Sequence, residues 1–382
     1  MDFLFIVEDA NLRGGTEIQT FNLMSAICDR GKDSMILSLT PYKGNDSHVL
    51  SLTETEYKRW SSKSGSLLDR LSFRAYSDLF LRKTFRDYAE RYNVTAIICQ
   101  TYDIITALPS ERWAVQVLNW SIIGYESSIL CRINKKRGIK KYLSLFTNVG
   151  VTFRRHRCLQ HISRIVVLSS AAVNELLELN PRIKASNVIT IPNALTVRED
   201  RPHVSSLENK NLVFVGRLSQ EKGVMRLLRI WGRVRLQLSD YSLSVYGEGS
   251  AMDEMRAYIA DHQMDRVYLK GFCRNLEDIY KHADLLLMTS DTEGFGLVLI
   301  EAMYYGVPCV AFDCPVSPKE IIADAGVTLP CFDEEAYANE VVALLRDKNR
   351  LRDLQIRALN RAKDFYIDKV IKLWIEMLNS VD

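Results

Sequence analysis

The sequence has 382 residues, of which 47% are hydrophobic and 25% charged, which is typical of a soluble globular protein with room for two domains. Its net charge of +3 does not by itself indicate a nucleic-acid-binding protein. Its eight cysteines include no Cys-x-x-Cys pair and lie mostly in apolar runs. We therefore expect buried free thiols in a reducing cytoplasm, and neither a zinc site nor a disulfide framework.

The first predicted element is a strand at residues 3–7. No basic residue precedes it, and the sequence turns acidic at Glu8 and Asp9, so we interpret this stretch as a strand and not as a signal peptide. No apolar run in the chain approaches the roughly eighteen residues that a membrane span requires.

A Gly-Gly turn, Gly14-Gly15, follows this strand and leads into a helical pattern. We expect Thr16 to cap the start of the helix and Gly31 to cap its end. Such a turn between a strand and a helix lets a phosphate approach the backbone of a doubly wound sheet, although a plain tight turn has the same composition. The G-x-G-x-x-G fingerprint is absent, which disfavours NAD.

Strands at 34–39, 95–99 and 113–118 follow, with a polar, helix-leaning stretch between the first two. Residues 132–164, the basic segment, then fall within a stretch without any acidic residue. The cations of this segment are Arg132, Lys135, Lys136, Arg137, Lys140, Lys141, Arg154, Arg155, Arg157 and Arg164. The segment is either a solvated basic face of ordinary helices or a surface for an anionic partner, such as an anionic membrane. No recognised nucleic-acid motif accompanies it.

Linker composition over residues 196–209 marks a boundary between two predicted domains. We expect a first domain at residues 1–194, a second at 195–364, and a C-terminal helix at 365–382. That helix has a single apolar face, which suits packing against a neighbouring element.

The second domain opens with a strand that ends at Gly216 and a helix that begins after Gly223. Arg217 and Lys222 flank the turn between them. On residue type alone, these are two loop cations that are either solvated or part of a site.

A second Gly-rich turn, Glu293-Gly-Phe-Gly-Leu, follows an apolar strand at residues 284–290. Gly294 and Gly296 let the backbone approach a ligand, and the helix that follows offers unpaired N–H donors that suit phosphate. Glu301 comes eight residues after Glu293, about 12 Å of axial rise in a helix. That spacing fits one carboxylate on each sugar of a nucleotide-sugar, although two solvated carboxylates are the plain alternative.

The Glu-x7-Glu pattern, with Gly-Phe-Gly-Leu inside it and Glu-Ala-Met-x-x-Gly-x-Pro at its end, resembles the signature of retaining glycosyltransferase family 4 (glycosyl transferases group 1). The resemblance implies the α/β GT-B fold, with two Rossmann-like domains facing a central cleft and a last helix that crosses back to the first domain. The first domain would then bind the acceptor and the second the nucleotide-sugar. Residues 216–223 resemble the family's Gly-Arg-Leu-x-x-x-Lys-Gly, and residues 14–17 its Gly-Gly-x-Glu.

The resemblance also implies the activity. We expect a retaining, metal-independent enzyme that moves a hexosyl or N-acetylhexosaminyl unit from a UDP-linked sugar to a hydroxyl of a lipid-linked surface-glycan precursor. Residues 313–322 resemble a variant in transferases that use UDP-galactose or UDP-N-acetylhexosamines. The nucleotide-sugar is a substrate, so no cofactor or metal is expected. The expected place of action is the cytoplasm, at the inner face of the membrane, with no nucleic acid as a partner.

By resemblance, Arg217 and Lys222 clamp the donor diphosphate, and Glu293 orients the sugar. Fixed cations in a dry site stabilise the charge that grows on the leaving group, which is why the three are expected to be catalytic. The expected donor-binding residues are Gly14, Gly15, Gly216, Gly271, Phe272, Gly294, Phe295, Gly296, Leu297 and Glu301.

Asn119 departs from the family pattern, because many members carry a histidine at the end of the corresponding strand. Asparagine can donate or accept a hydrogen bond but cannot act as a general base, so Asn119 is only an acceptor-side candidate. The departure leaves open a non-catalytic GT-B subunit that binds a nucleotide-sugar or a partner transferase. A Rossmann-type enzyme with NAD, such as a sugar-nucleotide epimerase, would need the missing glycine fingerprint.

Overall fold

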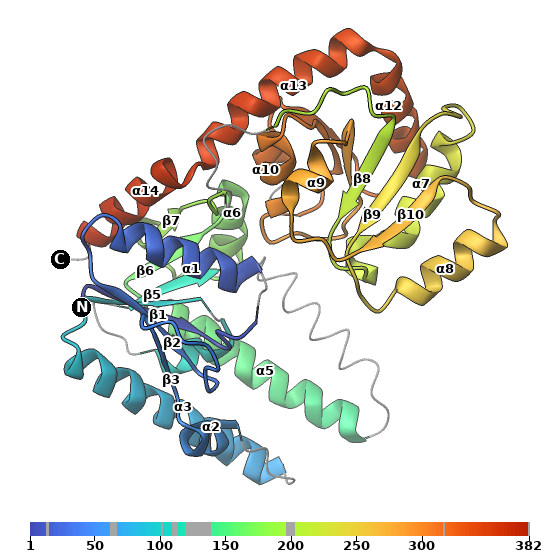
Figure 1. The fold of residues 1–382 in the computed structure, drawn as a ribbon. Helices are drawn as coiled ribbons and strands as arrows, with labels where there is room; N and C mark the ends of the chain where they lie inside the picture. Colours follow the sequence, from blue (N-terminus) through green and yellow to red (C-terminus); the bar gives the residue numbers. More distant parts are fainter. Residues whose placement is uncertain are drawn as a thin grey trace. The chain divides into compact units, whose positions relative to one another are not determined.

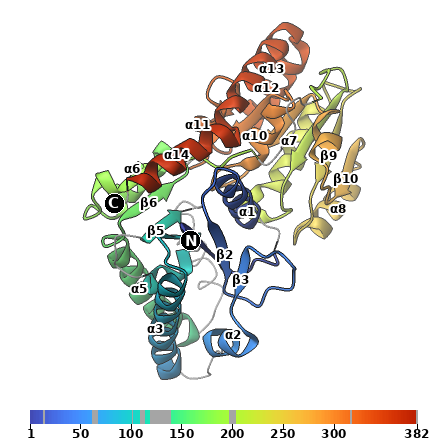
Figure 2. The ribbon, with the colours of Figure 1, turned by 60° about the vertical axis from the view of Figure 1, so that its left-hand side comes forward.

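The computed structural model describes residues 1–12, 15–61, 67–100, 102–108, 114–118, 139–195, 203–315 and 318–380. The chain divides into two compact units. One consists of Met1–Thr196 with Ile367–Asp382, and the other of Val197–Tyr366. Figures 1 and 2 show that each unit is a twisted sheet with helices packed on it.

The first unit contains seven parallel strands among its described residues, in the order β3-β2-β1-β4-β5-β6-β7. The strands are β1 (Phe3–Val7), β2 (Ser34–Ser38), β3 (Val49–Ser51), β4 (Ala96–Cys99), β5 (Ala114–Leu118), β6 (Arg164–Val167) and β7 (Val188–Thr190). The helices are α1 (Gly15–Cys28), α2 (Glu54–Ser61), α3 (Leu67–Arg91), η1 (Tyr102–Ala107), α5 (Ile139–Leu159), α6 (Ser170–Leu179), η2 (Ala185–Asn187) and α14 (Ile367–Asn379). The central strands are apolar along their length because helices cover both faces of a parallel sheet.

The second unit repeats this plan with six parallel strands, in the order β10-β9-β8-β11-β12-β13. The strands are β8 (Asn211–Val215), β9 (Ser242–Tyr246), β10 (Val267–Gly271), β11 (Leu285–Met288), β12 (Cys309–Phe312) and β13 (Gly326–Leu329). The helices are η3 (Gln220–Lys222), α7 (Val224–Val234), α8 (Met252–Asp261), α9 (Leu276–Tyr280), α10 (Leu297–Tyr304), α11 (Pro318–Ile322), α12 (Glu334–Arg346), α13 (Lys348–Ala362) and η4 (Lys363–Phe365). Two parallel, Rossmann-like sheets confirm the predicted α/β fold.

Helix α7 shows how the sequence builds the second core. Its apolar residues recur at helical spacing, and Leu227, Leu228 and Trp231 are fully buried. Its opposite face carries arginines. The helix begins directly after Gly223, which has a left-handed backbone with φ of 65°, so the loop before it reverses direction without steric strain.

The last helix, α14, packs into the core of the first unit alongside α1 (Figure 1). Val370, Ile371 and Trp374 form its buried stripe, and Asp368 makes an ion pair with Arg30, two residues after the end of α1. The apolar face predicted for this helix therefore covers the first sheet's core, although the chain reaches it only after completing the second unit.

Two local expectations in the first unit were wrong. Thr16 is not the cap of α1, because the helix already includes Gly15 and the Thr16 carbonyl accepts a hydrogen bond from the Thr20 hydroxyl at 2.8 Å. Strand β3 was not predicted, since three partly buried residues at a sheet edge show no clear alternation. The expected end of α1 was correct, because Gly31 is left-handed with φ of 78° and its N–H donates to the Cys28 carbonyl.

Helices long and apolar enough to cross a bilayer are not found in the described part of the chain.

Candidate active site

The candidate site lies where the strand order of the second sheet reverses. Strands β8 and β11 pair side by side in parallel, while the chain proceeds from β8 toward β9 on one side and from β11 toward β12 on the other. In an open α/β sheet, ligands bind at the carboxyl ends of the strands at such a switch point. The loops that leave these two ends are residues 216–223, the β8 loop, and residues 289–296, the β11 loop.

Backbone contacts hold the two loops together. The Asp291 N–H donates to the Glu221 carbonyl at 2.8 Å, and the Thr289 hydroxyl lies 3.1 Å from the carbonyls of both Lys222 and Gly223. A Cβ atom on Gly223 would lie 2.0 Å from the Thr289 carbonyl oxygen. Only glycine fits this approach, so Gly223 is required both for its left-handed backbone and for contact between the loops.

A buried carboxylate lies at the centre of the joined loops. The Lys222 ammonium and the Ser290 hydroxyl both donate to Oε1 of Glu293, each at 2.6 Å. Glu293 is only 7% exposed. Both of these donors reach the same oxygen, so Oε2 can accept hydrogen bonds from a ligand. An ammonium also carries three protons and can bind an anion while it remains paired with Glu293.

The other residues proposed from the β8 loop are less enclosed. The Arg217 side chain is 62% exposed and its guanidinium lies 4.0 Å from Glu221 Oε1. Gly216 donates to the Tyr246 carbonyl at 3.0 Å. Gly247 lies very close to Gly216: a Cβ atom added to Gly247 would lie 1.9 Å from the Gly216 carbonyl oxygen. The structure thus places Arg217 on the same loop as Lys222, but only Lys222 contacts Glu293.

Gly271 and Phe272 lie at the end of β10, two strands away from β8. Gly271 is left-handed with φ of 71°, and its carbonyl accepts from the Gly247 N–H at 2.8 Å. Phe272 is 67% exposed, so its ring has a free face.

Helix α10 begins at Leu297, directly after left-handed Gly296 with φ of 86°. Its first N–H groups have no partner inside the helix, so the helix start is suited to an anion. The Phe295 side chain is 3% exposed and packs edge-on against Phe365. Phe295 can therefore contribute to a site only through its backbone.

The helical spacing assumed for the two carboxylates was wrong. Because α10 begins at Leu297, only the part of the segment from Leu297 to Glu301 is helical. Its four residue-to-residue rises account for about 6 Å along the helix axis. The turn at Gly294 and Gly296 supplies the rest of the separation from Glu293.

Glu301 lies within reach of a phenol. The Tyr280 hydroxyl donates to Oε2 of Glu301 at 3.4 Å, and the Tyr280 ring stacks on Tyr305 with centroids 5.7 Å apart. Burial raises the pKa of Glu301 to about 7, and the hydrogen bond from Tyr280 lowers it in part. Glu301 therefore keeps its proton to a higher pH than an exposed glutamate does.

Some proposed residues fall elsewhere. Gly14 and Asn119 lie outside the described residues, and Gly15 is the first residue of α1 in the other unit. Sequence reasoning also missed Ser290, Tyr280 and the Arg226 side chain, none of which belongs to a pattern with a spacing of its own. No cluster of three or more potential metal ligands occurs in the part of the chain that the structure describes.

A family model agrees with this site. Residues 209–347, which include both joined loops and Glu301, match the model of glycosyl transferases group 1. The chain is 28% identical over 177 residues to the amylovoran biosynthesis glycosyltransferase AmsD of Erwinia amylovora. The matched residues make up 46% of this chain and 50% of that protein.

A second relative, from Campylobacter jejuni, is named GalNAc-alpha-(1->4)-GalNAc-alpha-(1->3)-diNAcBac-PP-undecaprenol alpha-1,4-N-acetyl-D-galactosaminyltransferase. It is 29% identical over 181 residues, which cover 46% of this chain and 50% of that protein. The matches thus span about half the length of these two curated relatives.

The fold is also found among solved structures. Anabaena Alr3699/HepE, in complex with UDP and glucose, superposes with a TM-score of 0.71 over all of both chains at 18% identity. The overlap extends through both sheets, whereas the family model covers only part of the second unit. Residues 209–347 therefore belong to the glycosyl transferases group 1 family, in a chain with the GT-B fold.

Proposed function

We propose that this chain is a retaining, metal-independent glycosyltransferase that moves a hexosyl or N-acetylhexosaminyl unit from a UDP-linked sugar to a hydroxyl of a surface-glycan precursor. The observation that carries the proposal is the pairing of Lys222 and Ser290 with buried Glu293, directly before the start of α10. This arrangement offers a cation and backbone donors for a diphosphate, and a carboxylate oxygen for sugar hydroxyls.

Each group has a role in this proposal. Lys222 and Arg217 bind the diphosphate, together with the N–H groups at the start of α10. Glu293 accepts hydrogen bonds from the transferred sugar through Oε2, and Glu301 holds the ribose. Phe272 and Gly271, at the end of β10, contact the base.

In the proposed reaction, the acceptor oxygen attacks the anomeric carbon from the side that the UDP leaves. The bond between the anomeric carbon and the phosphate oxygen breaks, and that phosphate oxygen takes the proton of the acceptor hydroxyl. Negative charge therefore grows on the diphosphate while the bond breaks. Lys222 stabilises this charge more in the transition state than in the bound donor, which is how a fixed cation accelerates such a step.

Thermal unfolding with nucleotides tests the donor class. UDP, GDP, ADP and NAD are added separately to the purified protein in the presence of EDTA. UDP at a hundred times its dissociation constant should add about 2.7 kcal/mol to the free energy of unfolding. A rise in melting temperature with UDP and not with NAD is expected. No rise with any of the nucleoside diphosphates would contradict the proposal, and a rise with GDP alone would contradict the choice of UDP.

The affinity for UDP is expected to fall as the pH drops below about 7. Ribose hydroxyls donate hydrogen bonds best to ionised Glu301, whose pKa burial raises to about 7. Below that pH the carboxyl group is protonated in the free protein and must release its proton on binding, so affinity falls by up to about tenfold per pH unit. Calorimetric titration from pH 5.5 to 8.5 measures this.

Two variants make that pH experiment specific. Tyr280→Phe removes the hydrogen bond that lowers the Glu301 pKa, so the midpoint of the affinity profile should move to higher pH. Glu301→Gln removes this titrating group, so its profile should keep only the pH dependence of the UDP terminal phosphate, whose second pKa is about 6. A wild-type profile that matches the Glu301→Gln profile would show that Glu301 does not hold the ribose.

We also infer that the acceptor is lipid-linked and that the first unit meets an anionic membrane. The name of the Campylobacter relative includes a PP-undecaprenol-linked glycan. On α5, Val149 and Phe153 lie one turn apart, are 61% and 67% exposed, and stand beside exposed Arg157. The rest of the basic segment does not all face outward, since Arg155 is buried and Arg164 donates to a backbone carbonyl at 2.9 Å.

Co-sedimentation with lipid vesicles checks the membrane proposal. Binding to phosphatidylglycerol vesicles, but not to neutral phosphatidylcholine vesicles, is expected at low salt, and Phe153→Asp should weaken it. Equal behaviour of the two lipids would contradict an electrostatic contact.

A further inference from the structure

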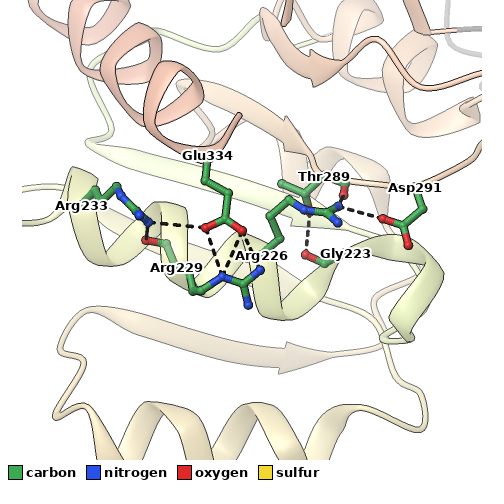
Figure 3. Close-up of polar contacts among 7 residues, drawn as sticks. All are labelled: Gly223, Arg226, Arg229, Arg233, Thr289, Asp291 and Glu334. Atoms are coloured by element: carbon green, nitrogen blue, oxygen red, sulfur yellow. Dashed lines mark hydrogen bonds and ion pairs between the residues drawn. The ribbon is translucent and has the colours of Figure 1, made fainter. Parts of the chain in front are cut away.

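Three arginines on α7 make two different kinds of contact (Figure 3). Arg229 and Arg233 reach Glu334 at the start of α12. Arg226, one turn closer to the start of the helix, turns instead toward the β11 loop, where Figure 3 shows it beside Thr289 and Asp291. The first contact joins two helices, whereas the second reaches the loop that carries Glu293.

The two Arg226 contacts lie on either side of Ser290, which donates a hydrogen bond to Glu293. Its Nη1 donates to the Thr289 carbonyl and to Oδ1 of Asp291, each at 2.8 Å. Ser290, between these two residues, donates to Oε1 of Glu293 at 2.6 Å. The guanidinium therefore fixes the backbone before Ser290 and the side chain after it.

The guanidinium is itself held in place. Its side chain is 15% exposed, and its central carbon lies 4.2 Å from the ring centroid of Phe332 and 5.6 Å from that of Phe312. Aromatic faces orient the planar group through cation–π contact. A side chain bound by two hydrogen bonds and two rings cannot swing out to contact a ligand, so its effect must pass through the loop.

We propose that Arg226 is a positioning residue for the donor site, which sets the distance between Lys222 and Glu293 by fixing the β11 loop to the start of α7. Lys222 directly precedes Gly223 and α7, and Glu293 belongs to the loop that Arg226 holds. The 2.6 Å contact between them therefore depends on how the two loops lie against each other. The proposal rests on the proposed function, because it concerns the same donor site.

Arg229 supplies a matched control. It makes a forked contact with Glu334, with its Nε 3.0 Å from both carboxylate oxygens and its Nη2 2.6 Å from one of them. Arg229→Met thus removes an arginine–carboxylate pair from the same helix without touching either donor loop. An effect of Arg226→Met that came only from weakening α7 would also appear in Arg229→Met.

The test uses two measurements on the full chain. Hydrogen–deuterium exchange of the amides at residues 289–296 reports the order of the β11 loop without any ligand. Isothermal titration with UDP reports the donor site. Arg226→Met should speed the exchange and raise the UDP dissociation constant on the order of tenfold to a hundredfold, as expected when binding groups are displaced by a fraction of an ångström.

Arg226→Lys should fall between wild type and Arg226→Met, because lysine keeps the charge but lacks the planar fork and the stacking. It also keeps the test decisive if the methionine variant does not fold. Arg229→Met should stay within about twofold of wild type in both measurements, as expected for a pair outside the site.

The proposal is overturned if Arg226→Met and Arg226→Lys match Arg229→Met in loop exchange or in UDP affinity. A wild-type protein that binds no UDP would refute the proposed function separately. The exchange comparison would still decide whether Arg226 orders the loop.

Discussion

Replacing Glu293 by glutamine is expected to lower the rate of sugar transfer about a thousandfold, at the upper end of what loss of one preorganised polar group costs in an enzyme. Glutamine has the same shape and can still accept from Ser290 and Lys222, so the loop should keep its structure. It has no charge to balance the Lys222 ammonium or to bind sugar hydroxyls strongly. The rate of UDP release from a UDP-sugar in the presence of an acceptor glycan measures the effect.

Glu335→Gln is the control for this change. Glu335 is an exposed glutamate in the first turn of α12, so its neutralisation should leave the rate unchanged. A Glu293→Gln variant that transfers sugar at the wild-type rate would remove Glu293 from the proposed mechanism.

Lys222→Met is expected to raise the dissociation constant for UDP about a hundredfold, which corresponds to about 2.7 kcal/mol. The change removes the cation proposed to bind the diphosphate and leaves the buried Glu293 carboxylate without its partner. Truncating one member of a buried, hydrogen-bonded charge pair has effects of this size. Calorimetric titration with UDP measures the change, and the melting temperature of the variant should fall as well.

Lys210→Met tests whether the effect belongs to the site or to ion pairs in general. Lys210 contacts Asp240 at the same 2.6 Å distance, but both side chains are more than half exposed. Exposed pairs contribute little to stability, so this variant should keep its UDP affinity and its melting temperature. If the two variants behaved alike, Lys222 would not be a binding residue.

The local parts of the candidate site could be predicted from sequence, because they depend on neighbours in the chain. The apolar run before Glu293 and the two glycines after it specify a strand, a turn and a helix, and β11, the turn and α10 follow that order. The turn between Gly216 and Gly223 was recognised in the same way. Both turns need backbone shapes that favour glycine, which leaves a visible signal.

The contacts between the loops could not be predicted, because the residues involved are far apart in the chain. Lys222 and Glu293 are 71 positions apart, and Arg226 is 65 positions from Asp291. An arginine on the polar face of an amphipathic helix gives the same pattern whether it points to solvent or to a loop. The strand order of the sheet brings the ends of β8 and β11 together, and this decides that Arg226 points to the β11 loop and not to solvent.

The pKa of Glu301 was also invisible in the sequence. Its raised value comes from burial, and the tyrosine that lowers it in part lies on another helix. Spacing alone suggested a helical separation from Glu293, whereas the turn before α10 makes the segment only partly helical. A carboxylate's position in a motif therefore did not predict its ionisation state.

A crystal structure of the chain with UDP tests the central claim most directly. The account predicts diphosphate oxygens within hydrogen-bond distance of Lys222 Nζ and of the N–H groups at the start of α10, with ribose hydroxyls on the Glu301 carboxylate. UDP bound away from the ends of β8 and β11, or bound with neither Lys222 nor Glu301 in contact, would contradict it.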